Sequence, residues 1–140
     1  MVKKDFYSTS NQKASFLAYI ETLNTHKPQT PLDLSNFMQP LIVVNNETYT
    51  LSEYETSLLN LMNAAPDFHI SVQKLIAEGS TIATRFLVTC TPEQLYMGFS
   101  PNGKRIEYAE HVFYRFCGKK CCEISALIDI KAVESQLSKE

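Results

Sequence analysis

The hydrophobic period of this chain changes at Pro66, and no other feature constrains the fold as strongly. Before Pro66, apolar residues recur at helical spacing, most clearly over residues 16–23. After it, apolar and polar residues alternate over residues 68–73 and 82–88, as they do in strands with one buried face. Helices first and strands after them predict an α+β domain, with the helices on one face of a mostly antiparallel sheet.

Local signals divide the first 66 residues into three helices and one short strand. An N-cap side chain accepts a hydrogen bond from the first turn of a helix, and proline disfavours helix in the residue before it. The first predicted helix begins at Ser10 as its N-cap and ends at the Lys27–Pro31 segment. A short helix over residues 32–38 and a short strand over 41–44 follow. The third helix begins at a capping box of Thr50 and Glu53 and ends at Pro66.

About six strands joined by short turns are expected in the molecule, most of them after Pro66. A turn at Glu78–Gly79 joins the first two strands of this region. The other predicted elements are strands over residues 93–100, 104–117 and 120–130, a two-residue hairpin turn at Gly118–Lys119, and a closing helical turn over 131–137.

Pairing across the Gly118–Lys119 turn predicts which side chains share a face. Counting outward from the turn, the predicted pairs are Cys117 with Lys120, Tyr114 with Glu123, Val112 with Ser125 and Tyr108 with Asp129. One face then carries Tyr108, Glu110, Val112, Tyr114, Glu123, Ser125, Leu127 and Asp129, and the other carries Ala109, His111, Phe113, Ile124, Ala126 and Ile128. A slip of one residue in the register exchanges these assignments.

Charge and composition exclude two classes of partner. The chain has 13 Lys and Arg against 15 Asp and Glu, so it has no basic surface for a phosphate backbone, and nucleic-acid binding is excluded. No run approaches the roughly 20 apolar residues of a membrane span, and the start of the chain lacks a signal peptide. We therefore expect a cytoplasmic protein with one domain over residues 1–140, in which residues 1–9 form a loose extension.

Two patterns resemble binding motifs but fit them poorly. Cys117, Cys121 and Cys122 match no zinc spacing, and without an export signal all four cysteines are expected to be thiols. The Gly98–Arg105 segment is close to a phosphate-binding loop, but an arginine stands where Ser or Thr must contact Mg²⁺, and a strand follows rather than a helix. This segment is predicted to be a turn, and neither a metal nor a cofactor is expected.

Asp129 is the residue with the clearest chemical potential, because it lies in the apolar run Ala126–Ile130. Desolvation there would favour the protonated carboxyl near neutral pH, which suits acid/base catalysis. The alternative is that Asp129 caps the final helical turn, a position that aspartate favours. The spacing alone leaves both possibilities open.

The order of several motifs resembles the SnoaL-like polyketide cyclase family, within the nuclear transport factor two superfamily. The similarity covers about residues 10–138 and is strongest after Pro66. The motifs that carry it are Ala65–Ile70, Leu75–Gly79 followed by Ile82–Arg85, Gly103–Arg105, His111–Phe116, and the run from Glu123 through Leu127-Ile128-Asp129 to Gln136-Leu137.

The resemblance implies a cone-shaped, strongly curved sheet around a cavity, with the helices closing its open side. It also implies that Asp129 is the acid/base residue for an intramolecular aldol ring closure that needs no cofactor. Two positions depart from the family pattern, since Thr91-Pro92 stands where the family often has Thr-His, and Ser125 stands where it has Trp. These departures remove an imidazole and a large aromatic side chain, and they favour a non-catalytic ligand-binding domain.

Two kinds of function therefore remain open. The first is a cofactor-independent cyclase or isomerase acting on an apolar carbonyl compound, and the second is a non-catalytic ligand-binding or dimerisation module of the same fold. The expected catalytic residues are Asp129 and His111, and the expected binding residues are Tyr96, Tyr108, Glu110, Tyr114 and Ser125. A homodimer is also expected, formed through apolar side chains that alternate onto an outer face, namely Phe113, Ile124, Ala126 and Ile128.

Overall fold

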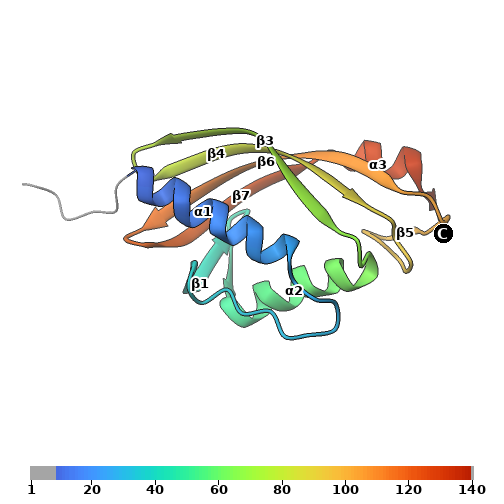
Figure 1. Cartoon of the computed structure of the whole chain (residues 1–140), viewed down its shortest axis with the longest axis horizontal. Coiled ribbons are helices and arrows are strands. Elements are labelled where there is room, and N and C mark those ends of the chain that lie inside the picture. The colour runs from blue at the N-terminus through green and yellow to red at the C-terminus, as the bar shows by residue number, and fades with distance from the viewer. Residues whose placement is uncertain (1–8, 140) are drawn as a thin grey trace, which may run out of the picture.

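A strongly curved sheet with two helices on its concave side forms the body of the protein (Figure 1). The structure is a computed structural model that describes residues 9–139. The loose extension expected over residues 1–9 lies outside this range, except for Thr9, which starts the first helix. No helix within the described range is long and apolar enough to cross a membrane. The predicted α+β class with a curved, mostly antiparallel sheet is confirmed.

Six strands make up the main sheet, in the order β2-β1-β7-β6-β4-β3. All neighbouring strands in it are antiparallel except β1 and β7, which pair in parallel. The strands are β1 Met38–Val44, β2 Glu47–Thr50, β3 His69–Glu78, β4 Thr81–Cys90, β6 Ile106–Cys117 and β7 Lys120–Ile128, and a separate small sheet joins β5 Phe99–Ser100 to β8 Ser138–Lys139.

Helix α1 (Thr9–Asn24) closes part of the concave side. Its buried side chains, at helical spacing, are Gln12, Phe16, Tyr19, Ile20 and Leu23. The Asn24 amide fixes the end of the helix to β3, because it donates to the Ile70 carbonyl at 2.9 Å and accepts from the Ile70 amide at 2.8 Å. Ser10 lies inside α1, so its prediction as the N-cap is wrong.

The helix predicted over residues 32–38 is absent, so two helices precede Pro66 in the described chain rather than three. Residues 35–37 form a turn in which the Met38 amide donates to the Leu34 carbonyl at 3.0 Å. The helical pattern stops after this turn because Met38 begins β1 and pairs with β7. By contrast, helix α2 (Leu51–Ala64) begins at the predicted capping box of Thr50 and Glu53, both of whose hydrogen bonds are present.

The predicted strand over residues 41–44 is part of β1 and has an antiparallel partner that the sequence analysis missed. Asn45 and Asn46 connect β1 to β2, both with positive φ, 49° and 72°. Two central residues with positive φ are typical of a type I′ hairpin turn, and asparagine tolerates this conformation well. The Asn45 side chain also accepts a hydrogen bond from the Ala126 amide at 2.8 Å, which ties this turn to β7.

The segment before β6 is mostly loop, so the strand predicted over residues 93–100 is reduced to β5. Tyr96 and Phe99 exchange two backbone hydrogen bonds of 3.0 Å around a tight turn, in which Met97 has a φ of 53° and Gly98 a φ of 85°. The prediction that Gly98–Arg105 is a turn and not a phosphate-binding loop is confirmed, because a strand, β6, follows it at Ile106.

A bulge in β7 overturns most of the predicted hairpin register. Cys117 pairs with Lys120 as expected, but the pairing then jumps from Phe116↔Cys121 to Arg115↔Glu123. The extra residue on β7 is Cys122, and it moves every later residue of that strand to the other face. The predicted pairs Tyr114–Glu123, Val112–Ser125 and Tyr108–Asp129 are therefore wrong, and the observed partners of Tyr114, Phe113 and Val112 are Ile124, Ser125 and Ala126.

This shift also changes which apolar residues are exposed. Ile124 is buried, while Ala126 and Ile128 pack against the core of the concave side. Of the four side chains expected on the outer face, only Phe113 lies there, with 58% of its surface exposed.

The bulge brings Cys122 to Cys117, and the two form a disulfide across the end of the hairpin. The prediction that all four cysteines are thiols is therefore wrong for this pair. It is confirmed for Cys90 and Cys121, which are buried and free. Burial raises the pKa of the Cys121 thiol to about 12, so it stays protonated.

Replacing Cys117 by serine is expected to lower the free energy of unfolding by about 2 kcal/mol, because the disulfide restricts a short loop of the unfolded chain. Urea denaturation of the oxidised wild type and of Cys117→Ser measures the difference. Reductant should lower the stability of the wild type to that of the variant and leave the variant unchanged. Equal stability of the wild type with and without reductant would contradict this role.

Candidate functional site

A half-buried carboxyl, that of Glu110, lies on the concave face at the centre of the sheet. Its direct cross-strand neighbours are Phe86 on β4 and Ile128 on β7. Along β6, the residues on either side of it on this face are Tyr108 and Val112, both buried. The carboxyl therefore lies among aromatic and aliphatic side chains on all four sides within the sheet.

This apolar setting changes the acidity of Glu110. Burial raises the pKa of its carboxyl to about 7, because the low dielectric of the surroundings disfavours the charged form. Glu110 can therefore both lose and gain a proton near neutral pH, as a general acid or base requires.

Tyrosine hydroxyls surround this part of the concave side. Burial raises the pKa of Tyr54, Tyr108 and Tyr114, and the charge of Glu110 raises each of them further. Their hydroxyls are therefore protonated at neutral pH and able to donate hydrogen bonds. Because the charge of Glu110 acts on all three, one carboxyl and three phenols share the same region of the concave side.

Two hydroxyl pairs hold these phenols in place. The Tyr96 and Tyr108 oxygens lie 2.6 Å apart in the core, which links the loop before β5 to β6. The Tyr19 and Tyr54 oxygens lie 3.0 Å apart, which links α1 to α2. Tyrosines near Glu110 therefore join α1 to α2, and the loop before β5 to the sheet.

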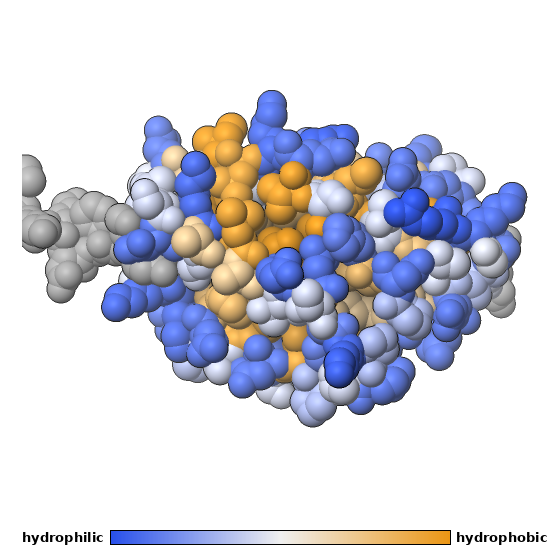
Figure 2. Space-filling view, in the orientation of Figure 1, coloured by the Kyte–Doolittle hydropathy of each residue, from blue (hydrophilic) through white to orange (hydrophobic). Residues whose placement is uncertain are grey.

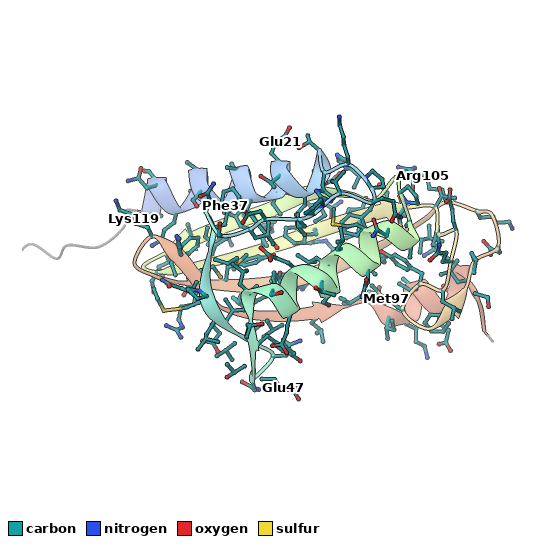
Figure 3. All side chains as sticks on the ribbon, turned by 90° about the horizontal axis from the view of Figure 1, so that it is seen from below. Glu21, Phe37, Glu47, Met97, Arg105 and Lys119 are labelled. Atoms are coloured by element: carbon teal, nitrogen blue, oxygen red, sulfur yellow. A yellow bond between two sulfur atoms is a disulfide. The ribbon has the colours of Figure 1, made fainter. Side chains whose placement is uncertain are left out.

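The two ends of the concave side differ in packing. Next to α1, aromatic rings fill the space, and the void between Phe16, Tyr19 and Tyr114 has a volume of only about 10 Å³, about what one water molecule needs. Toward α2, Glu110 and Ile128 are only half-buried. Figure 3, seen from the helix side, shows Met97 beside α2 at this second end.

A larger hollow lies on the outside of α2. It has a volume of about 470 Å³ between this helix and the loop that carries Leu95 and Met97. Its lining is mixed, with Thr56, Ser57 and Asn60 beside Leu61 and Ala64. The same loop supplies Tyr96, whose side chain points the other way, into the core.

Asp129 does not point into the concave side, so that part of the sequence prediction is wrong. It is exposed, and its carboxylate accepts a hydrogen bond from the Ala132 amide at 3.2 Å as the N-cap of α3 (Ile130–Gln136). The physical reason is the bulge at Cys122, which turns odd-numbered positions of β7 outward, together with the end of β7 at Ile128. Of the two alternatives for Asp129, the structure has the helix cap.

His111 and Ser125 also lie on the convex face, away from Glu110. His111 is exposed, and its Nε2 accepts a hydrogen bond from the Arg85 guanidinium at 2.8 Å. Ser125 is exposed opposite Phe113. Of the seven predicted site residues, the structure brings together Tyr96, Tyr108, Glu110 and Tyr114 on the inner side, and it separates Ser125, His111 and Asp129 from them.

Three inner residues were not predicted for the site, namely Tyr19, Tyr54 and Phe86. Each was visible only as an apolar position of a helix or strand pattern. Whether they lie close to Glu110, or to the tyrosine hydroxyls around it, depends on how α1 and α2 cross the sheet. The hydrophobic pattern of a single helix or strand does not contain this information.

Comparisons with known proteins agree with this architecture. The model of the family described as SnoaL-like polyketide cyclase matches residues 14–137. A SnoaL-like polyketide cyclase from Agrobacterium tumefaciens is 29% identical, with a TM-score of 0.80, over 89% of this chain and 96% of that one.

Two more distant structures share the fold. TsrD from Streptomyces laurentii is 11% identical, with a TM-score of 0.82, over 93% of this chain and 96% of that one. AclR from Streptomyces galilaeus is 20% identical, with a TM-score of 0.77, over 92% and 96%. No curated protein matches the chain.

Proposed function

Since the chain belongs to the SnoaL-like polyketide cyclase family, we propose that it catalyses cofactor-independent acid/base chemistry on an apolar carbonyl compound, with Glu110 as the base. The observation that carries this proposal is the half-buried Glu110 carboxyl among apolar neighbours, whose pKa is raised to about 7. A base of this strength is half ionised near neutral pH, where general base catalysis is most efficient.

The proposed reaction begins with removal of a proton from the carbon next to a carbonyl group. The ionised carboxylate of Glu110 takes this proton, and the electron pair of the C–H bond moves into an enolate. The hydroxyl of Tyr108 or Tyr114 donates a hydrogen bond to the enolate oxygen and stabilises its charge. Tyr96 acts on Tyr108 as a positioning residue through the 2.6 Å contact between their hydroxyls.

Two outcomes conserve atoms and electrons. In a cyclisation, the enolate carbon attacks a second carbonyl of the same molecule, and Glu110 returns its proton to the new alkoxide. In an isomerisation, Glu110 returns the proton to a different carbon of the conjugated system. Both outcomes leave the carboxylate ionised again, and neither requires an oxidant or reductant.

The apolar bicyclic ketone 2-tetralone tests the proposal without knowledge of the natural substrate. In D₂O, the protein is expected to accelerate exchange of the hydrogens next to the carbonyl, as followed by NMR. The rate should rise with pH through about 7 and then level, because only the ionised Glu110 accepts a proton. A rate without a midpoint in that region, or no acceleration over buffer, would contradict Glu110 as the base.

A second candidate function is non-catalytic binding of a small apolar ligand. It is favoured by the position of Asp129, which the family resemblance made the acid/base residue and which here caps α3 at the surface. Binding of 2-tetralone that raises the melting temperature without any exchange would support this candidate against the catalytic one.

A further inference from the structure

The Cys117–Cys122 disulfide lies at the end of the β6–β7 hairpin, at the surface of the molecule. Cys117 and the Gly118–Lys119 turn are exposed, and Cys122 is half-buried. In Figure 1 this turn lies at the left end of the sheet, and Figure 2 shows mostly hydrophilic residues at that end. Because Cys90 and Cys121 are buried, Cys117 and Cys122 are the two cysteines that a small thiol in solution can reach.

The two sulfur atoms of this disulfide have different surroundings. The Nη1 atom of the Arg115 guanidinium lies 3.3 Å from the Sγ of Cys117. The Sγ of Cys122 lies instead 3.5 Å from the carbonyl oxygen of Arg115. A cation stabilises negative charge on a sulfur atom, whereas a carbonyl oxygen stabilises a thiol that donates to it. When the disulfide opens, Cys117 is therefore the better thiolate and Cys122 the better thiol.

An ion pair holds the Arg115 guanidinium in this position. Its Nε lies 2.8 Å from a carboxylate oxygen of Glu123, which leaves Nη1 for the sulfur of Cys117. The segment 115–123 carries three cations against one carboxylate, that of Glu123. The cations are Arg115, Lys119 and Lys120, and Figure 3 shows Lys119 at the same end of the molecule as the turn. The hairpin end therefore attracts small anions.

The hairpin does not depend on the disulfide for its pairing. Backbone pairs between β6 and β7 extend from Cys117 and Lys120 at the turn to Glu110 and Ile128 at the other end. The side-chain amide of Gln39 also donates to the Cys117 carbonyl at 2.9 Å, which fixes this end of β6 to β1. The two cysteines therefore stay close together after reduction, and their bond can form again without unfolding of the chain.

We propose that Cys117 and Cys122 are a redox-active site that exchanges reversibly with small thiols of net negative charge, such as glutathione. In the first step of reduction, a glutathione thiolate attacks the Sγ of Cys122, the disulfide bond breaks, and Cys117 leaves as a thiolate beside Arg115. In the second step, another glutathione thiolate attacks the sulfur of the bound glutathione, which releases Cys122 and forms glutathione disulfide. The two cysteines gain the electrons and protons that the two glutathione molecules lose, and oxidation by glutathione disulfide is the reverse.

Trapping of the intermediate tests the site and the order of events. The oxidised full chain is mixed with glutathione and quenched with iodoacetamide, and trypsin then cuts after Lys119 and Lys120, so that Cys117 and Cys122 lie on separate peptides. Mass spectrometry is expected to find glutathione on Cys122 and the alkyl group on Cys117. Glutathione on Cys117 would overturn the assignment of the leaving sulfur. A disulfide that glutathione does not open, or that glutathione disulfide does not restore, would overturn the site.

A charge variant tests the role of Arg115. Arg115→Gln should slow reduction by glutathione about 10-fold, because it removes the cation beside the leaving sulfur. Arg85→Gln is the matched control, since Arg85 is exposed and pairs with His111 in the middle of β6 rather than at its end. This control loses the same charge and should react at the wild-type rate. Circular dichroism confirms that both variants are folded, and an Arg115→Gln variant as fast as Arg85→Gln would overturn the role of the cation.

The preference for negative thiols is tested with cysteamine, a small thiol that carries an ammonium group. At equal thiolate concentration and low salt, glutathione should reduce the wild type about 10-fold faster than cysteamine does. Both rates are divided by the rate at which the same thiol reduces hydroxyethyl disulfide, which is neutral, so that the intrinsic reactivity of the thiol cancels. The ratio should approach one as salt screens the charges. A ratio of one already at low salt would overturn the selectivity for negative thiols.

Discussion

Replacing Glu110 by glutamine is expected to reduce the exchange of 2-tetralone hydrogens by about 100-fold or more at about pH 8. The amide has nearly the same shape as the carboxyl but accepts no proton, so the variant keeps the site and loses the base. NMR of the ketone in D₂O measures the rate for the wild type and the variant under the same conditions. The remaining slow exchange should no longer show the midpoint near pH 7.

Glu107→Gln is the matched control for this experiment. Glu107 lies on the same strand, three residues earlier, and is exposed on the opposite face, so its amide variant should exchange the hydrogens of the ketone at the wild-type rate.

Asp129→Asn tests whether Glu110 or Asp129 is the base. Full activity in this variant agrees with Glu110 as the base, whereas loss of activity in Asp129→Asn but not in Glu110→Gln would contradict the proposed mechanism.

The Glu110→Gln substitution should also increase the stability of the protein. Replacing a glutamate that stabilises the fold through an ion pair would instead lower it. Folding raises the pKa of Glu110 from an ordinary value near 4.5 to about 7, so the folded state binds more protons in this range than the unfolded state. Stability is therefore lost as the pH rises through this window, and the loss is complete above it. At about pH 8, Glu110→Gln should unfold with a free energy about 1–3 kcal/mol higher than the wild type.

Much of the fold could be predicted because its signals are local. The capping box of Thr50 and Glu53 fixes the start of α2, and the alternation after Pro66 fixes β3 and β4. The even-numbered face of β6 could also be predicted, and with it the grouping of Tyr108, Glu110 and Tyr114. These features depend on neighbours within a few residues along the chain.

The errors came from pairings over longer distances. Residues 32–38 have the apolar spacing of a helix, but pairing of Met38 with Cys121 on β7 takes the chain into β1 instead. Strand β2 is short and mostly exposed, so it has no buried face to produce an alternating pattern. The turn at Asn45 and Asn46 was the available signal for this hairpin.

The bulge at Cys122 had the largest consequence for the site. Apolar residues occupy both faces of β7, with Ile124 on one and Leu127 on the other, so either register fits the sequence pattern. One extra residue therefore exchanges the two faces of β7 without any change in how well the sequence pattern fits. It places Asp129 at the surface and not in the expected cavity. It left β6 unchanged, which is why Glu110 remained on the inner face.

Replacing Phe16 by alanine is expected to lower the free energy of unfolding by about 3–5 kcal/mol, since it leaves a cavity in a region with almost no free space. Phe16 is 2% exposed, and its ring centre lies 5.0 Å from that of Tyr114 and 6.1 Å from that of Phe86. Urea denaturation measures the loss. Leu17→Ala is the control on the same helix, because Leu17 is 48% exposed and its truncation should cost less than about 1 kcal/mol.

The same variant tests whether α1 maintains the chemistry of Glu110. Phe86 is the direct cross-strand neighbour of Glu110, and Phe16 stacks on the ring of Phe86 with an interplanar angle of 8°. Without Phe16, water can reach this part of the concave side, so the pKa of Glu110 should fall toward its ordinary value. The midpoint of ketone exchange should then move to lower pH in Phe16→Ala and stay in place in Leu17→Ala. An unchanged midpoint in a folded but destabilised Phe16→Ala would show that the sheet alone, without α1, sets the acidity of Glu110.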